Sequence, residues 1–124
     1  MNLVDSSGWI EYFDDGRNAD YFTVPIQDVE NLLVPAICAY EVFKRISLKR
    51  GEEDALRSIG FMSLGREVGL DREIAISAAQ ISLESKLAMA DSIILATARS
   101  YDATLWTQDE HFKNIPGVKF VEKK

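Results

Sequence analysis

Four short apolar segments, separated by longer segments with helical character, constrain the fold of this chain most strongly. They are NLV from residue 2, LLVP from residue 32, ATLWT from residue 103 and GVKFVE from residue 117. The runs of Leu and Val do not alternate with polar residues, as is typical of strands covered on both faces. Such strands, alternating with helices, predict an α/β fold with a mostly parallel sheet flanked by helices.

The intervening segments carry helix signals at their ends. SSGWIEYFDDG predicts a first helix capped by a serine, and residues 18–31 are predicted to be partly helical, with Pro25 interrupting the helix or opening a new turn. Pro35 and Gly51 are predicted to bound the next helix, over about residues 36–49. Further helices are expected within 52–64, 71–86 (capped by Asp71) and 89–101, a short strand or turn at 66–70, and a helical turn at 109–115.

The composition narrows the class of protein. At 124 residues, with 27% charged and 47% hydrophobic residues, the chain suits one globular domain. Its net charge of −6 argues against nonspecific coating of nucleic acid, but not against acids gathered around a metal ion. No apolar run of about 18 residues and no signal peptide is found, so no membrane contact and a cytoplasmic location are expected. The single cysteine, Cys38, is expected to be a buried, unreactive thiol.

Acidic residues follow the predicted strands. Ligands of open α/β sheets bind beyond the carboxyl ends of the strands. Asp5 directly follows NLV, and Asp109 follows TLWT after one intervening residue. Glu41 lies on the helix after LLVP, and Asp91 lies at the start of the apolar helix that leads into TLWT. These four carboxylates are therefore candidates to meet at one edge of the sheet.

Each acid also has a simpler structural explanation. Asp91 is consistent with a helix N-cap and Asp109 with a turn residue. Asp5 is consistent with a cap of the first helix, although the serines after it offer the same function. Glu41 is consistent with a surface residue that pairs with a basic residue one turn later. A helical wheel predicts that the apolar face of its helix comprises Ala36, Ala39, Tyr40, Phe43 and Ile46.

Taken together, the acids indicate metal chemistry. Carboxylates held close repel one another, and one takes up a proton unless a cation neutralises them. Oxygen ligands alone select hard cations such as Mg²⁺ or Mn²⁺. An ion bound there can turn water into a nucleophile and neutralise the charge that develops on a phosphodiester. The cluster therefore indicates a metal-dependent nuclease.

Four motifs carry a family resemblance. LVDSS, PAICAYEVFKR, ADSIILATA and LWTQDEHF resemble the motifs of PIN-domain ribonucleases, and most of all the VapC toxins of prokaryotic VapBC toxin–antitoxin pairs. The resemblance extends over essentially the whole chain, in the family's order. It implies a single PIN domain over residues 1–124, folded as a three-layer sandwich with a central, mostly parallel sheet.

The resemblance also implies the roles of individual residues. One or two Mg²⁺ or Mn²⁺ ions are expected at an acidic quartet supported by a hydroxyl; these residues are Asp5, Glu41, Asp91 and Asp109, with Thr107 as the hydroxyl. Ser6 is expected to give similar support beside Asp5. Many relatives carry a second acid where this chain has His111, which we expect to be exposed or hydrogen-bonding rather than a metal ligand or base. Glu110 is a weaker candidate ligand than Asp109.

The implied function is that of a toxin. VapC-like proteins are typically dimers that cut RNA, often at structured sites in tRNA or rRNA, and are inhibited by a VapB antitoxin. Metal-activated water would leave a 5′-phosphate and a 3′-hydroxyl. Two alternatives stay open, a PIN nuclease of RNA processing without an antitoxin and a non-catalytic PIN-like binding module. The four intact acids argue against the second. Receiver and dehalogenase-like phosphatase folds fit poorly, because their motifs are missing.

Two further groups of residues bear on the surface. The segment KRISLKR, residues 44–50, holds four basic residues that are suited to RNA phosphates or an antitoxin, or simply to the helix dipole. Of these, Lys44 and Arg45, together with Ser6, are the predicted contacts for RNA or antitoxin. Trp9, Tyr12 and Phe13 are expected in the core or a dimer interface rather than in a base-stacking platform.

Overall fold

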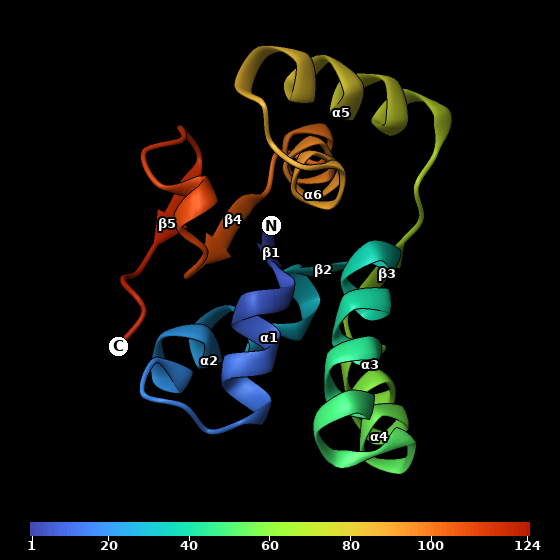
Figure 1. Cartoon of the computed structure of the whole chain (residues 1–124), viewed down its shortest axis with the longest axis vertical. Coiled ribbons are helices and arrows are strands. Elements are labelled where there is room, and N and C mark those ends of the chain that lie inside the picture. The colour runs from blue at the N-terminus through green and yellow to red at the C-terminus, as the bar shows by residue number, and fades with distance from the viewer.

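The five strands form one sheet in which every neighbouring pair is parallel, as Figure 1 shows for the computed structural model of residues 1–124. Their spatial order is β3-β2-β1-β4-β5. The strands are β1 (Asn2–Val4), β2 (Leu32–Pro35), β3 (Arg66–Val68), β4 (Thr104–Thr107) and β5 (Val118–Phe120). The predicted α/β fold with a parallel sheet is therefore confirmed.

The helices cover both faces of this sheet. They are α1 (Ser6–Phe13), α2 (Ala19–Gln27), α3 (Ala36–Arg50), α4 (Glu52–Met62), α5 (Arg72–Ser85) and α6 (Met89–Ser100), with short 3₁₀ turns η1 (Val29–Asn31) and η2 (Glu110–Phe112). The chain advances one way from β1 to β3 and then returns to β4. Right-handed crossovers in opposite directions place their helices on opposite faces. Accordingly, α1–α4 lie on one side and α5 and α6 on the other (Figure 1), and the three-layer arrangement is confirmed.

The core lies where the central strands meet the helices. Leu3 in β1 pairs with Leu33 in β2 and with Leu105 in β4, and all three side chains are fully buried. On the helical side, Trp9 is also fully buried and stacks on Phe13, with ring centroids 5.6 Å apart. The expectation that this aromatic segment lies in the core or a dimer interface is confirmed for Trp9 as core, and Tyr12 and Phe13 pack against that core while partly buried.

Three local predictions need correction. The N-cap of α1 is Asp5 rather than a serine: its Oδ1 accepts a hydrogen bond from the Gly8 backbone nitrogen at 3.0 Å. Pro25 lies inside α2 without ending it. The predicted apolar face of α3 is right for Ile46, which is buried, but wrong for Ala36 and Tyr40, which are exposed. Tyr40 is 60% exposed, and the buried face consists of Cys38, Val42 and Ile46, which follow one another at intervals of four residues.

Other predicted boundaries hold. Pro35 and Gly51 bound α3, and Asp71 caps α5 by accepting a hydrogen bond from the Ile74 backbone nitrogen at 2.8 Å. The Cys38 thiol is fully buried, and burial raises its pKa well above the ordinary value, so it is not a reactive thiolate. None of the helices combines the length and the apolar character that crossing a bilayer requires.

The sheet positions the candidate site. Because β1, β2 and β4 run parallel, their carboxyl ends lie at one edge. Asp5 leaves β1 at this edge, and its backbone nitrogen donates to the Trp106 carbonyl of β4 at 3.2 Å. Asp109 follows β4 after one intervening residue, and Glu41 lies in α3, the helix after β2. The fold thus directs three of the four predicted acids to the same edge.

Candidate metal centre

Asp5 is a buried carboxylate that accepts several hydrogen bonds. Its side chain is nearly inaccessible, with the residue only 2% exposed. Oδ1 accepts from the Ser7 hydroxyl at 2.7 Å as well as from Gly8, and Oδ2 accepts from the Thr107 hydroxyl at 2.6 Å. These donors fix the orientation of the carboxylate. Asp5 is therefore both a helix cap and a pre-oriented acid.

Thr107 joins two of the predicted acids. While its Oγ1 donates to Asp5, the same oxygen accepts a hydrogen bond from the Asp109 backbone nitrogen at 2.9 Å. The residue is fully buried at the end of β4. This is the structural support that the family resemblance implied for its hydroxyl. A change at Thr107 would disturb both Asp5 and the segment that carries Asp109.

The two serines after β1 have different partners. Ser7 rather than Ser6 donates to Asp5, so the hydroxyl support expected of Ser6 is given to a different acid of the candidate site. The Ser6 hydroxyl donates instead to Glu41 Oε1 at 2.7 Å. Ser6 and Ser7 are neighbours on the first turn of α1, and their side chains diverge toward two different acids. Through Ser6, Glu41 is tied to the turn that Asp5 caps.

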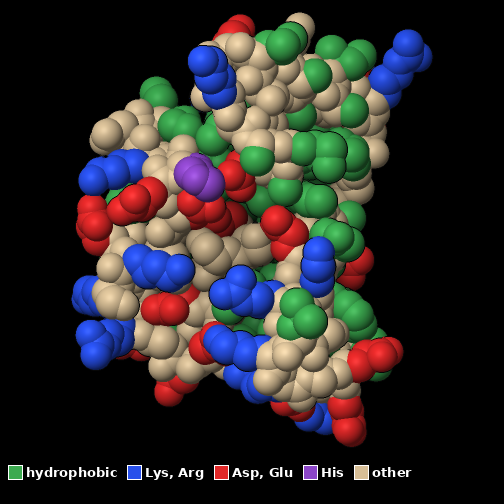
Figure 2. All heavy atoms as spheres, viewed as in Figure 1, with side chains coloured by type: hydrophobic (Ala, Val, Ile, Leu, Met, Phe, Trp, Pro, Cys, Tyr) green, Lys and Arg blue, Asp and Glu red, His purple; other side chains and the backbone are tan.

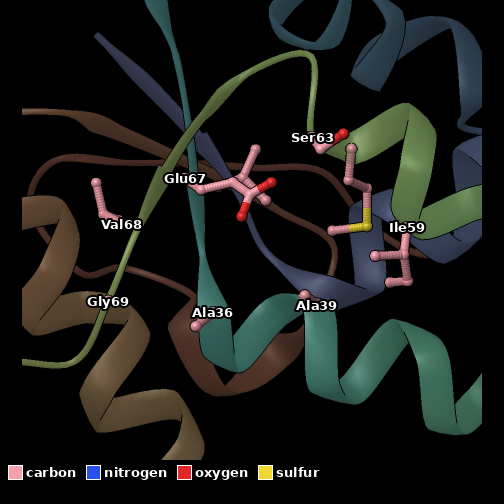
Figure 3. A pocket seen from close by; sticks show the side chains of 9 residues that line it. Ala36, Ala39, Ile59, Ser63, Glu67, Val68 and Gly69 are labelled. Carbon is pink, nitrogen blue, oxygen red and sulfur yellow. The ribbon is translucent and has the colours of Figure 1, made fainter.

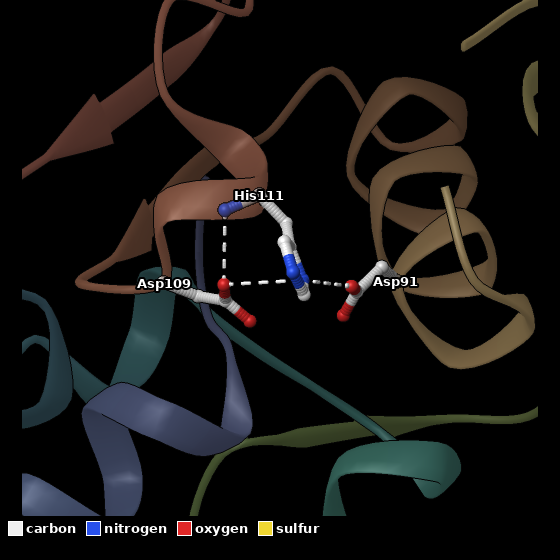
Figure 4. A group of neighbouring side chains, drawn as sticks. All are labelled: Asp91, Asp109 and His111. Carbon is white, nitrogen blue, oxygen red and sulfur yellow. Dashed lines mark hydrogen bonds and ion pairs between the residues drawn. The ribbon is translucent and has the colours of Figure 1, made fainter. Parts of the chain in front are cut away.

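Asp91, Asp109 and His111 converge from two elements (Figure 4). The His111 Nδ1 lies 3.1 Å from Asp91 Oδ2 and 3.3 Å from Asp109 Oδ1, and the His111 backbone nitrogen donates to Asp109 Oδ1 at 3.0 Å. Asp91 is not the cap of α6, because that position belongs to Ala88, which makes no side-chain cap bond. His111 is exposed and hydrogen-bonded, as expected.

Burial and the closeness of the negative charges shift the pKa values of three residues of the candidate site. Burial, with a smaller contribution from the Asp109 charge, raises the pKa of Asp5 from 3.8 to about 6, although the hydrogen bonds from Thr107, Ser7 and Gly8 lower it. Burial also raises the pKa of Asp91, again with a contribution from Asp109. Conversely, Asp109 and then Asp91 raise the pKa of His111, because they favour its charged form.

The pKa of Asp5 predicts a pH dependence of stability. A carboxyl whose pKa is higher in the folded state binds its proton more tightly there, so stability falls as pH rises from about 4 to 6 and then levels off. For Asp5, the loss in free energy of unfolding amounts to about 3 kcal/mol. Urea unfolding of the metal-free protein at several pH values should show this loss, and Asp5→Asn should remove that part of it. An identical pH profile in the variant would contradict the assignment.

The donor set fits a divalent cation. It consists of carboxylates crowded at one sheet edge, and two of them, Asp5 and Asp91, have a raised pKa because burial disfavours their charged forms. An ion at this edge would favour the charged forms. Asp91, Asp109 and His111 offer donor atoms within 4.8 Å of one another, whereas Asp5 and Glu41 do not belong to this tightest group.

Two surface hollows adjoin the acids and share Ser7. One, of about 360 Å³, is lined by Ser6, Ser7, Ile10, Tyr40, Glu41, Lys44, Arg45 and Leu48. The other, of about 390 Å³, is lined by Ser7, Gln108, Asp109, Glu110, His111 and Lys123. In Figure 2 the histidine lies beside a group of acidic side chains, with basic side chains around it. Basic groups thus flank the acidic centre.

The four basic residues of α3 divide into two pairs. Lys44 and Arg45 line the hollow beside Glu41, as predicted. Lys49 and Arg50 instead form ion pairs with Asp14, at 2.7 and 2.9 Å. Only the first pair is therefore directed toward the candidate site.

Some residues of the site escaped the sequence analysis. Ser7 could have been noticed, because it is the second of two serines after Asp5. Asn18 and Gln108 gave no signal, yet both are buried, and Asn18 Nδ2 donates to Gln108 Oε1 and to the Glu122 carbonyl, each at 2.9 Å. This contact anchors the segment between Thr107 and Asp109.

A separate pocket lies away from the acids. It holds about 210 Å³ between α3, α4 and the β2–β3 edge (Figure 3), and mostly apolar side chains line it: Val34, Ala36, Ala39, Ile59, Met62, Ser63, Glu67, Val68 and Gly69. Its single ionisable side chain is Glu67. It has no cluster of chemically reactive groups, so the acidic sheet edge is the better candidate site.

The fold and this acidic edge define a class of proteins, those with a PIN domain. A model of the PIN domain matches residues 3–118, and the chain belongs to this family. No curated protein matches the sequence significantly.

Several solved structures are similar to this chain over nearly its whole length. A toxin–antitoxin complex from Klebsiella pneumoniae is similar with a TM-score of 0.77 and 25% identity, covering 96% of each chain. VapC20 of Mycobacterium tuberculosis, described as a sarcin–ricin loop cleaving toxin, has a TM-score of 0.77 and 13% identity over 99% of this chain and 98% of its own. DNA-bound VapBC from Salmonella typhimurium has a TM-score of 0.75 and 18% identity over 98% of each chain. The last two show the fold alone.

Proposed function

We propose that this protein is a metal-dependent endoribonuclease and the toxin of a type II toxin–antitoxin pair, with residues 1–124 forming one PIN domain. The observation that carries the proposal is a set of contacts at the carboxyl edge of the parallel sheet. Thr107 links Asp5 to Asp109, His111 lies between Asp109 and Asp91, and Ser6 links Glu41 to the turn after Asp5. Family membership supports nuclease chemistry. The likeness to the Klebsiella pneumoniae complex supports the toxin role.

The chain's own residues would divide the work as follows. Asp5, Glu41, Asp91 and Asp109 would hold one or two divalent ions, Mg²⁺ or Mn²⁺. When bound, such ions activate water and neutralise charge on the phosphodiester. Thr107 holds Asp5 and the Asp109 backbone in register through its hydroxyl. Attack of water on phosphorus, in line with the leaving 3′-oxygen, leaves a 5′-phosphate and a 3′-hydroxyl.

RNA would approach through the hollow beside Glu41. Lys44 and Arg45 line it and have no carboxylate partner, so they are available for phosphates. The substrate proposed is tRNA or rRNA. A VapB-like antitoxin would cover the same groove, with Ser6, Lys44 and Arg45 among its contacts, and the active form would be a homodimer. Because the proposed substrate and antitoxin are cytoplasmic molecules, we propose a cytoplasmic location for this activity.

The decisive experiment uses the purified protein without antitoxin. Mixed tRNA and rRNA are incubated with it in Mg²⁺, in Mn²⁺ and in EDTA, and the ends of the products are mapped. Cleavage with either ion but not with EDTA, leaving 5′-phosphate ends, is expected. Equal inactivity under all three conditions, with no Mn²⁺ bound, would overturn the proposal.

The two basic pairs of α3 provide a matched comparison. Lys44→Ala/Arg45→Ala should weaken RNA binding and reduce the dependence of log K on log salt by about 1.4, because about 0.7 counterions are released for each contacted single-strand phosphate. Lys49→Ala/Arg50→Ala removes the same charge from the pair held by Asp14 and should change this slope little. Binding of a short RNA at several salt concentrations measures both. If the two double variants showed the same salt dependence of RNA binding, RNA would not bind in the hollow beside Glu41.

A further inference from the structure

His111 closes the acidic centre on its exposed side. Its imidazole lies between Asp91 and Asp109, which are less exposed than it is (Figure 4). We propose that His111 Nδ1 is itself a metal ligand, so that the centre is a mixed nitrogen–oxygen site that prefers a transition ion such as Mn²⁺ to Mg²⁺. This inference rests on the metal-dependent activity proposed above.

The distances fit one coordination shell. Adjacent ligands at about 2.1 Å from an octahedral ion lie about 3.0 Å apart. The separations of Nδ1 from Asp91 Oδ2 and Asp109 Oδ1, 3.1 and 3.3 Å, are close to this spacing. A neutral imidazole with its proton on Nε2 presents a lone pair at Nδ1. The donor atoms of all three side chains lie within 4.8 Å of one another, so they can share one ion.

The local backbone holds the histidine in this position. Asp109 caps the η2 turn by accepting a hydrogen bond from the His111 backbone nitrogen at 3.0 Å. The same turn buries Phe112 completely, so the segment is anchored in the core directly after His111. His111 is thus fixed next to one acid by its backbone and reaches the other with its ring, although its side chain is 68% exposed.

The donor chemistry determines the preferred ion. Mg²⁺ takes oxygen ligands in nearly ideal octahedral geometry, whereas a nitrogen ligand favours first-row transition ions. The alternative is that His111 serves only as a counter-ion to the two carboxylates and leaves when a metal binds. The alternatives differ in one observable, a nitrogen ligand on the bound ion.

Pulsed electron paramagnetic resonance of bound Mn²⁺ detects that ligand directly. The chain must be free of any histidine tag, because His111 is then its single histidine and the single source of an imidazole signal. Wild type should show an imidazole nitrogen coupling to Mn²⁺, and His111→Asp should lose it. Asp20→Asn, which changes an exposed acid of α2 outside the candidate site, should retain it. By calorimetry, the ratio of Mn²⁺ to Mg²⁺ affinity should fall about 10-fold in His111→Asp.

The outcomes separate this inference from the proposed function. Mn²⁺ binding to wild type without the nitrogen coupling would overturn the role of His111 and leave the acidic site standing. Failure of wild type to bind Mn²⁺ at all would overturn both. The wild-type spectrum alone decides the first question, so the test does not depend on the folding of a variant.

Discussion

Asp91→Asn should reduce metal-dependent RNA cleavage by about 100-fold or more. The substitution preserves the shape of the side chain and can still accept a hydrogen bond from His111, but it removes the charge of a proposed ligand. Because Asp91 does not cap α6, the helix should remain intact. Initial rates with saturating Mn²⁺ measure the effect, and calorimetry should show weaker Mn²⁺ binding.

Asp20→Asn is a matched control for this variant. Asp20 is an exposed acid in the first turn of α2 and belongs to no cluster of the candidate site. Its replacement should leave the cleavage rate within about twofold of wild type. If Asp91→Asn cleaved RNA at the wild-type rate with unchanged Mn²⁺ affinity, Asp91 would not be a ligand.

Trp9→Ala should lower the free energy of unfolding by about 3–5 kcal/mol. The indole is fully buried, stacks on Phe13 and meets the edge of Phe61 with centroids 6.3 Å apart. Truncation would leave a large cavity between α1 and α4. Urea unfolding followed by the fluorescence of Trp106, the other tryptophan, measures the change.

Trp9→Phe separates packing from polarity. Trp9 Nε1 is buried without a hydrogen-bond partner, so the phenyl ring loses no hydrogen bond. This variant should therefore lose less than half as much stability as Trp9→Ala. If Trp9→Ala instead retained wild-type stability and lost affinity for RNA, the aromatic group would be a base-stacking platform and not core.

The order of elements could be predicted from the sequence because it depends on local signals. Pro35 before α3, Gly51 after it and Asp71 before α5 act within a few residues of the chain. The exposed face of α3 could not be predicted in this way. Val42 and Tyr40 are both large and apolar enough for a core, and the direction in which α3 packs decides which of them is buried.

The candidate site shows the same division. Proximity to the ends of strands identified Asp5 and Asp109, because parallel strands end at a common edge. The partners of these acids depend on contacts between distant segments. Ser6 reaches Glu41 across 35 residues, and Thr107 reaches Asp5 across 102. No pattern in neighbouring letters assigns Ser7 to one acid and Ser6 to another.

By itself, the sequence determined the alternation of strands and helices, the family motifs and the identity of the acids, since these reside in residue types and short spacings. The tertiary structure alone decided that Asp5 is a buried cap with a raised pKa, that Lys49 and Arg50 pair with Asp14, and that His111 lies between two carboxylates. Burial and the distance between charges depend on the three-dimensional arrangement of the chain, and they are set only when the sheet brings distant segments to one edge.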